Sequence, residues 1–229
     1  MVQIDTIVFD LDGTLADASR DITNAVNFIL AGLGRPGIPV EVVASYIGGG
    51  AEVLWRKILK EEADELLPSV LPKFLQRYNE YYCVETVLYP GVMDVLSTLQ
   101  KAGFKMGIAT QKVEKITFGI LDSLGIRSFF PVVVGPESIT HRKPHPESVI
   151  KILDYLGSQP GQAWMVGDAP ADILAGKAAG TGTVGVSYGY GQVEEILSAG
   201  PDAMIDRLPD LLDLLYPVSS LSSGQDTGR

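Results

Sequence analysis

Cysteine and histidine are both scarce in this chain. Among its 229 residues there is one cysteine, Cys83, and there are two histidines, His141 and His145. A single cysteine excludes a disulfide within the chain, and its neighbours Tyr81 and Tyr82 on an expected helix indicate a packed thiol, not a nucleophile. Two histidines with no cysteine near them are too few for a zinc site, so we expect both to be ordinary loop residues.

Basic residues are outnumbered as well. The chain has 18 lysines and arginines against 28 aspartates and glutamates, a formal net charge of −10. Nucleic acids and anionic membranes bind to basic surfaces, so neither is an expected partner. A small phosphorylated metabolite is not excluded, because a few local cations and N–H groups can bind it. No secretory signal and no membrane-spanning apolar run are visible, so the expected location is the cytoplasm.

What the sequence does contain is an alternation of strand and helix patterns. Short runs rich in β-branched residues alternate, from Leu88 onward, with segments whose apolar residues recur at helical spacing. This order predicts an α/β fold, a Rossmann-like parallel sheet with helices on both faces. The expected strands are residues 4–9, 105–109, 132–134, 163–166, 183–186 and 203–205, and the expected helices are residues 92–101, 113–124, 147–156, 171–179, 193–199 and 208–215.

The segment between the first strand and residue 87 has a different pattern. It contains three expected helices, residues 21–30, 51–59 and 69–82, with Pro68 as a break before the third and no convincing strand. We therefore predict an all-helical cap, residues 17–86, inserted into a core of residues 1–16 and 87–216. The small, polar residues 217–229 are expected to be disordered.

Polar side chains follow several of the expected strands. Asp10, Thr110 and Asp168 come directly after strands, and Lys143 lies in the long loop after residues 132–134. In parallel sheets, ligands bind beyond the carboxyl ends of the strands. We therefore expect these four side chains to meet at one edge of the sheet.

Asp10 and Asp12 form the first candidate pair. Residues two apart in an extended segment point the same way, so their carboxylates would repel each other unless a cation lies between them. Mg²⁺ prefers such oxygen ligands. Asp10 could then attack phosphorus, while Asp12 donates a proton to the leaving oxygen and later accepts one from water. The N–H of Gly13 is available to a phosphate oxygen, although Asp-Gly alone is also a common turn.

The string IleValPheAspLeuAspGlyThrLeu, residues 7–15, resembles the first motif of the haloacid dehalogenase superfamily of phosphatases. The resemblance implies that Asp10 is the nucleophile and Asp12 the acid/base. It also implies a hydroxyl for the transferring phosphoryl group at Thr110, although threonine is equally a good helix N-cap. Gln111 stands where the family more often has asparagine, so the resemblance assigns no role to this amide.

Two later motifs extend the resemblance. Lys143 matches the family pattern Lys-Pro-x-Pro, in which the lysine screens the negative charge of the nucleophile and the phosphate. GlyAspAlaProAlaAsp, residues 167–172, matches the metal motif and implies that Asp168 binds Mg²⁺ and that Asp172 supports the metal shell. Asp172 would also be favoured by the helix dipole alone. Ala169 replaces the family's frequent serine, and we expect a minor effect.

The cap is expected to select the substrate. Its segment TyrIleGlyGlyGlyAla, residues 46–51, could receive an anion on the N–H groups of Gly49 and Gly50, or could be a simple turn. This segment and TyrGlyTyr, residues 188–190, resemble bacterial phosphoglycolate phosphatases, which implies hydrolysis of 2-phosphoglycolate. Another small phosphate ester, pyrophosphate, a phosphosugar mutase activity and a non-enzymatic binding role stay open. Arg20 and Arg56 are possible anion partners, and the chain could be a monomer or a homodimer.

Overall fold

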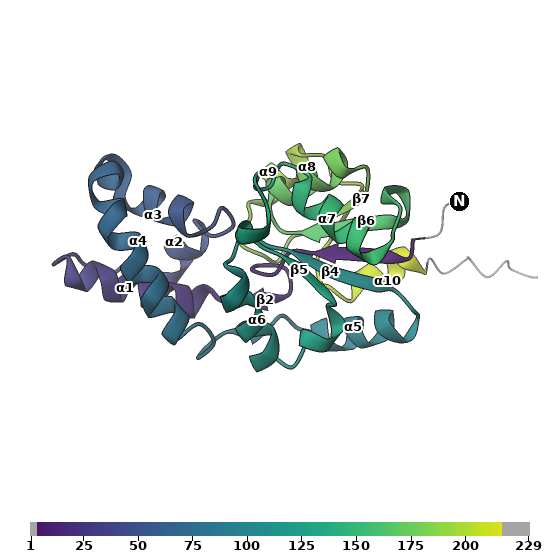
Figure 1. Cartoon of the computed structure of the whole chain (residues 1–229), viewed down its shortest axis with the longest axis horizontal. Coiled ribbons are helices and arrows are strands. Elements are labelled where there is room, and N and C mark those ends of the chain that lie inside the picture. Colours follow the sequence, from purple (N-terminus) through teal and green to yellow (C-terminus); the bar gives the residue numbers. More distant parts are fainter. Residues whose placement is uncertain (1–3, 217–229) are drawn as a thin grey trace, which may run out of the picture.

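Six strands form one parallel sheet in a computed structural model that describes residues 4–216 (Figure 1). The strand order is β5-β4-β1-β6-β7-β8, which places β1 between β4 and β6. The bounds are Thr6–Phe9 for β1, Lys105–Ala109 for β4, Val132–Val134 for β5, Ala163–Gly167 for β6, Gly182–Val186 for β7 and Ala203–Ile205 for β8. The predicted α/β fold is confirmed, and each strand lies within two residues of its predicted bounds.

Helices cover both faces of the sheet because successive strand residues point to opposite sides. Val8 packs on one side with residues of α7 and α8, whereas Ile7 and Phe9 pack on the other side with residues of α5, α6 and α10. Figure 1 shows α7 and α8 on one side of the strands and α5 and α6 on the other. The bounds are Val92–Lys101 for α5, Glu114–Ser123 for α6, Glu147–Leu156 for α7, Pro170–Ala179 for α8, Val193–Ser198 for α9 and Asp210–Leu215 for α10.

The predicted helical insertion is present and lies to the left of the sheet in Figure 1. It consists of α1 (Ser19–Gly32), α2 (Val40–Ala44), α3 (Ala51–Leu59) and α4 (Ala63–Glu80). Its interior is aromatic: the ring of Trp55 meets Phe74 edge-on at 5.7 Å between centroids, and Phe74 stacks on Tyr78 at 5.8 Å. None of the helices described between residues 4 and 216 is both long enough and apolar enough to cross a membrane.

Several local predictions for the insertion were wrong. Pro68 does not interrupt the helix, because α4 begins at Ala63 and continues through Pro68 and Pro72. Each proline removes one helical hydrogen bond, and the burial of Leu67, Val70, Phe74 and Tyr78 on one face offsets that cost. Cys83 is not on a helix, since α4 ends at Glu80, although it does pack partly buried against the core. The short α2 was not predicted.

A short ribbon joins the insertion to the core and was also not predicted. β2 (Ala16–Asp17) pairs antiparallel with β3 (Val87–Leu88), so both crossings between core and insertion lie side by side. The ribbon coincides with the predicted boundaries at residues 16/17 and 86/87, which remain a prediction. The tail, residues 217–229, lies outside the described residues, and so does the prediction that it is disordered. Short 3-10 helices occupy Lys60–Glu62, Arg127–Phe129, Pro136–Ser138 and Pro160–Gln162.

Asp21 of α1 holds the returning segment of the insertion in place. Its carboxylate, 3% exposed, accepts hydrogen bonds from the N–H groups of Val84, Glu85 and Thr86 and from the Thr86 hydroxyl, at 2.7–3.1 Å. Bonds from several donors to one buried carboxylate are strong, because the acceptor is charged. This one side chain therefore fixes the start of α1 to the chain just before β3.

We expect Asp21→Ala to lower the free energy of unfolding by at least about 2 kcal/mol, because it leaves several N–H groups without their acceptor. Urea denaturation followed by circular dichroism measures the change. Asp122→Ala, at an exposed position of α6, is the matched control and is expected to change stability by less than about 0.5 kcal/mol. Equal stabilities for the two variants would contradict the role given to Asp21.

Candidate active site

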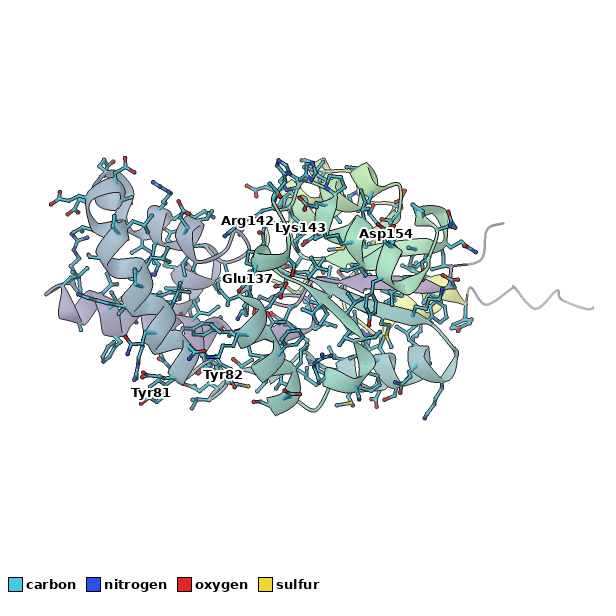
Figure 2. The ribbon with its side chains drawn as sticks, viewed as in Figure 1. Tyr81, Tyr82, Glu137, Arg142, Lys143 and Asp154 are labelled. Carbon is cyan, nitrogen blue, oxygen red and sulfur yellow. The ribbon has the colours of Figure 1, made fainter. Side chains whose placement is uncertain are left out.

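The structure brings the polar residues at the strand ends together at one edge of the sheet. Asp10 follows β1, Thr110 follows β4, and Asp168 follows β6, while Lys143 reaches the same place from the loop after β5. All four are buried, with exposed fractions between 3% and 7%. Figure 2 shows Lys143 and Arg142 on this loop, at the side of the core that faces the insertion.

Lys143 is bonded to three oxygens at once. Its Nζ donates to Asp10 Oδ1 at 2.7 Å, to Asp172 Oδ1 at 2.6 Å and to the carbonyl of Ala109 at 2.7 Å. An ammonium group has three N–H donors, so these bonds use all of them. Burial disfavours the charged form, but Asp10 and Asp172 raise the pKa of Lys143 above its usual value. Lys143 is thus a fixed cation beside the Asp10 carboxylate.

Three carboxylates converge around this cation. Oxygens of Asp10, Asp168 and Asp172 all lie within 4.8 Å of one another, and all three side chains are buried. Burial first, and then the negative charges of Asp172 and Asp168, raise the pKa of Asp10 well above the ordinary value. Burial and the charge of Asp172 raise the pKa of Asp168 to about 7.

This donor set fits a divalent cation. One lysine does not neutralise three carboxylates. A hard cation such as Mg²⁺ would offset the remaining charge and would find here the carboxylate oxygen ligands that it prefers. Asp172 has a further contact, since its Oδ2 accepts from the N–H of Ala169 at 3.0 Å. Ala169 has no hydroxyl, unlike the serine that is frequent in the family, and its backbone N–H makes this bond.

Asp12 lies apart from the carboxylate cluster. Its Oδ1 forms an ion pair with Lys112 Nζ at 2.9 Å, and both side chains are almost fully buried. Lys112 in turn donates to the hydroxyl of Tyr78 at 2.5 Å. Burial disfavours the charge on Lys112, but Asp12 and Tyr78 raise its pKa above the usual value. That the Asp12 carboxylate also binds the metal stays a prediction.

Sequence reasoning missed Lys112. Its position in the sequence could have indicated a role, because Lys112 follows Thr110 by two residues just beyond β4. This is the edge of the sheet where ligands were expected to bind. Thr110 and Gln111 also have defined contacts: the Thr110 hydroxyl oxygen accepts from the N–H of Lys112 at 3.1 Å, and the Gln111 amide donates to the carbonyl of Lys143 at 3.1 Å. The Thr110 O–H can still donate into the cavity. Gln111, to which no role was assigned, ties the loop of Lys143 to the end of β4.

The TyrGlyTyr segment covers Asp168. The N–H of Tyr190 donates to Asp168 Oδ2 at 2.7 Å, and the Tyr190 hydroxyl donates to Asp17 at 2.8 Å. The Tyr188 hydroxyl donates to the carbonyl of Thr14 at 2.8 Å. Gly189 passes so close that a Cβ there would lie 2.3 Å from the Cβ of Asp168. The segment, which sequence reasoning used only for the resemblance, therefore fixes one carboxylate of the buried cluster.

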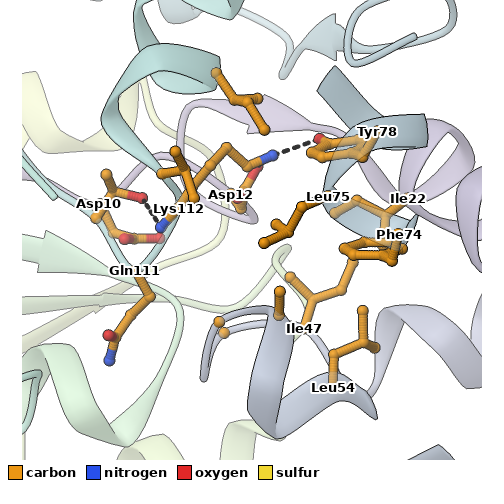
Figure 3. Close-up of a pocket in the computed structure, with 16 residues that line it drawn as sticks. Asp10, Asp12, Ile22, Ile47, Leu54, Phe74, Leu75, Tyr78, Gln111 and Lys112 are labelled. Atoms are coloured by element: carbon orange, nitrogen blue, oxygen red, sulfur yellow. Dashed lines mark hydrogen bonds and ion pairs between the residues drawn. The ribbon is translucent and has the colours of Figure 1, made fainter. Parts of the chain in front are cut away.

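A cavity of about 70 Å³ lies between core and insertion. Figure 3 shows Asp10, Asp12 and Lys112 on its core side and apolar side chains of the insertion opposite. Among the residues between 4 and 216 that line this cavity, Lys112 is the one basic residue. The insertion contributes Ile22, Ile47, Gly48, Gly50, Ala51, Leu54, Phe74, Leu75 and Tyr78.

The glycine segment forms the turn before α3. Gly48 and Gly50 have positive φ angles of 112° and 85° and line the cavity, whereas Gly49 packs beside Val53 and is not among the lining residues. Gly13, at φ 90°, passes so close to Asp168 that a Cβ there would lie 2.1 Å from Oδ2. The use of N–H groups of Gly13, Gly49 and Gly50 in binding stays a prediction.

The other candidate cations lie outside this cavity. Arg20 forms an exposed ion pair with Glu85 at 3.7 Å, and Arg56 pairs with Glu52 and Asp64 at 3.0 and 2.9 Å. These are surface ion pairs, which contribute little to stability or binding.

His141 and His145 lie exposed on the loop of Lys143. Their rings are 4.5 Å apart between centroids, and their nitrogens lie within 4.8 Å of a Glu147 oxygen. Glu147 accepts from the N–H groups of Thr140 and His141 at 2.8–3.1 Å, which lowers its pKa to about 2. The histidines are loop residues, as predicted, and Glu147 organises the backbone beside them.

Comparisons with a family model, with known sequences and with solved structures agree with one another. Residues 7–186 match the family model described as haloacid dehalogenase-like hydrolase. The chain is 34% identical to phosphoglycolate phosphatase 1 of Pseudomonas aeruginosa, over 94% of this chain and 84% of that protein. It is 36% identical to the phosphoglycolate phosphatase of Salmonella typhimurium, over 91% of each. A crystal structure of a predicted phosphoglycolate phosphatase from Haemophilus somnus superposes with a TM-score of 0.86 at 31% identity, over 93% of this chain and 99% of that one.

We expect Gly189→Ala to lower the free energy of unfolding by about 1–3 kcal/mol, because the new methyl group overlaps Asp168 and the carbonyl of Gly13, as overpacked sites do. Urea denaturation measures the difference. Gly161→Ala is the matched control, since a Cβ there meets nothing within 4 Å, and it is expected to change stability by less than about 0.5 kcal/mol. Wild-type stability of Gly189→Ala would show that the segment does not press on Asp168.

Proposed function

The chain belongs to the haloacid dehalogenase-like hydrolases and is a phosphatase of that family, and we propose that it hydrolyses 2-phosphoglycolate with Mg²⁺ through a phosphoaspartate on Asp10. One observation carries this proposal: the buried Asp10 carboxylate lies beside a fixed ammonium group and two further carboxylates, at the edge of a cavity. A nucleophile held in this way has one oxygen bonded to the protein and the other available to a substrate.

Asp10 is the nucleophile in the proposed reaction. Lys143 holds Oδ1, so Oδ2 attacks phosphorus while the bond between phosphorus and the ester oxygen breaks. Asp12, on the cavity wall, donates its proton to the departing alkoxide. Water then attacks the phosphoaspartate and gives a proton to Asp12, and the bond between phosphorus and Asp10 breaks to release phosphate.

The surrounding residues prepare this site electrostatically. Asp10, Asp168 and Asp172 would hold Mg²⁺, which would supply positive charge between the phosphate anion and the Asp10 carboxylate. Lys143 acts mainly by holding Asp10 and offsetting the carboxylates, because its three donors are engaged with protein oxygens. The Thr110 O–H is placed to donate to a phosphoryl oxygen, since Thr110 lines the cavity beside Asp10.

The assignment of 2-phosphoglycolate has two supports. Relatives of 34% and 36% identity carry the name phosphoglycolate phosphatase, and they align over most of both chains. The cavity is also small, and its wall offers a substrate carboxylate the ammonium of Lys112 and the turn at Gly48 and Gly50.

We expect release of phosphate from 2-phosphoglycolate with Mg²⁺, and loss of at least about 10³-fold in kcat with Asp10→Asn, because the amide cannot form the covalent intermediate. Phosphate release over a panel of small phosphate esters, pyrophosphate and glucose 1-phosphate measures both the rate and the preference. EDTA should abolish the reaction, and Mg²⁺ should restore it.

The panel separates the chemistry from the substrate name. Faster turnover of another ester would replace 2-phosphoglycolate and keep the phosphoaspartate reaction. Asp122→Ala, at an exposed position of α6 that does not line the cavity, serves as the control variant and should retain wild-type rates. Activity that survives in Asp10→Asn would contradict the assignment of the nucleophile.

A further inference from the structure

A chain of three side chains connects the insertion to Asp12. Tyr78 lies on α4 of the insertion, Lys112 follows β4 of the core, and Asp12 follows β1. The Tyr78 hydroxyl and Lys112 Nζ are 2.5 Å apart, and Lys112 Nζ and Asp12 Oδ1 are 2.9 Å apart. Figure 3 shows the Tyr78–Lys112 contact crossing the cavity edge between the two parts of the molecule.

The three groups have little freedom to move. Tyr78 is 3% exposed, and its ring stacks on Phe74 at 5.8 Å with an interplanar angle of 7°. Lys112 Nζ also lies 4.7 Å from the centre of the Tyr78 ring, within range of a cation–π contact. An ammonium group only donates, so the tyrosine oxygen accepts a hydrogen bond from Lys112, and the same ammonium group forms the ion pair with Asp12. The position of α4 therefore sets the position of the ammonium group.

We propose that Lys112 and Tyr78 are positioning residues for Asp12, so that the Asp12 carboxylate is aimed at the leaving oxygen when α4 lies over the core. This inference rests on the proposed role of Asp12 as acid/base. Without the hydrogen bond to Tyr78, the ammonium group of Lys112 would be free to rotate on its long side chain. Asp12 would then lose a fixed partner and a fixed orientation, while Asp10, Lys143, Asp168 and Asp172 would keep theirs.

The proposal predicts a defect that depends on the leaving group. Phenyl phosphate and p-nitrophenyl phosphate are similar in shape, but phenoxide needs a proton to depart and p-nitrophenoxide does not. Loss of a correctly oriented general acid therefore lowers the rate with phenyl phosphate and leaves the rate with p-nitrophenyl phosphate almost unchanged. A loss of packing, of cap closure or of phosphate binding would slow both to the same extent. The ratio of the two rates therefore separates positioning from a structural role.

The test is Tyr78→Phe, which removes only the hydroxyl and keeps the aromatic ring beside Phe74. We expect kcat/KM with phenyl phosphate to fall about tenfold and kcat/KM with p-nitrophenyl phosphate to change less than about twofold. Single-turnover phosphoenzyme formation with excess enzyme gives the same ratio where steady-state turnover is slow. Lys112→Gln should change the ratio in the same direction and by more, with folding of both variants checked by circular dichroism.

Tyr82→Phe is the matched control. Its ring packs over Gly119 of the core helix α6, so it also joins insertion and core, but no contact links it to Asp12. We expect wild-type rates on both substrates. An equal loss on both substrates, or no loss, in Tyr78→Phe would overturn the inference while the phosphatase assignment stands. Wild-type protein that hydrolyses neither these esters nor any member of the panel would instead contradict the proposed function.

Discussion

Repulsion between buried carboxylates is the constraint on which the site depends. Asp10, Asp168 and Asp172 bring three oxygen ligands within 4.8 Å of one another where water has little access. Such a group is stable only if cations share the space. Lys143 supplies one positive charge from within the chain, and its bonds to Asp10 and Asp172 fix both side chains. The remaining negative charge of the three carboxylates suits a divalent cation such as the proposed Mg²⁺.

The sheet order explains how the chain assembles this group from distant segments. β1 lies between β4 and β6, so Asp10, Thr110 and Asp168 leave adjacent strands at the same edge, although more than 150 residues separate the first from the last. Lys143 comes from the loop after β5, the next strand along. Parallel strands deliver side chains in this way because all their carboxyl ends point to one side.

The same geometry accounts for what could be predicted from the sequence. Strand ends are visible as apolar runs followed by polar residues, which was enough to predict the fold and to bring Asp10, Thr110, Lys143 and Asp168 together. The contacts of Lys112 and Gln111 depend on partners up to 100 residues away, Asp12 and Lys143, whose distances no local pattern encodes. The course of α4 through Pro68 depends on packing against α1 and α3, which overrides local helix propensity.

Three of the attachments that hold the insertion on the core differ in kind. The β2–β3 ribbon and the Asp21 carboxylate hold its two ends with hydrogen bonds to backbone groups. The third attachment, Tyr78 to Lys112, ends on Asp12. The first two would persist through a rotation of the helices about the ribbon, whereas the third is a single contact that such a rotation would break. Because this contact ends on the side chain of Asp12, the proposed acid/base, it would couple the arrangement of the insertion to the proposed chemistry.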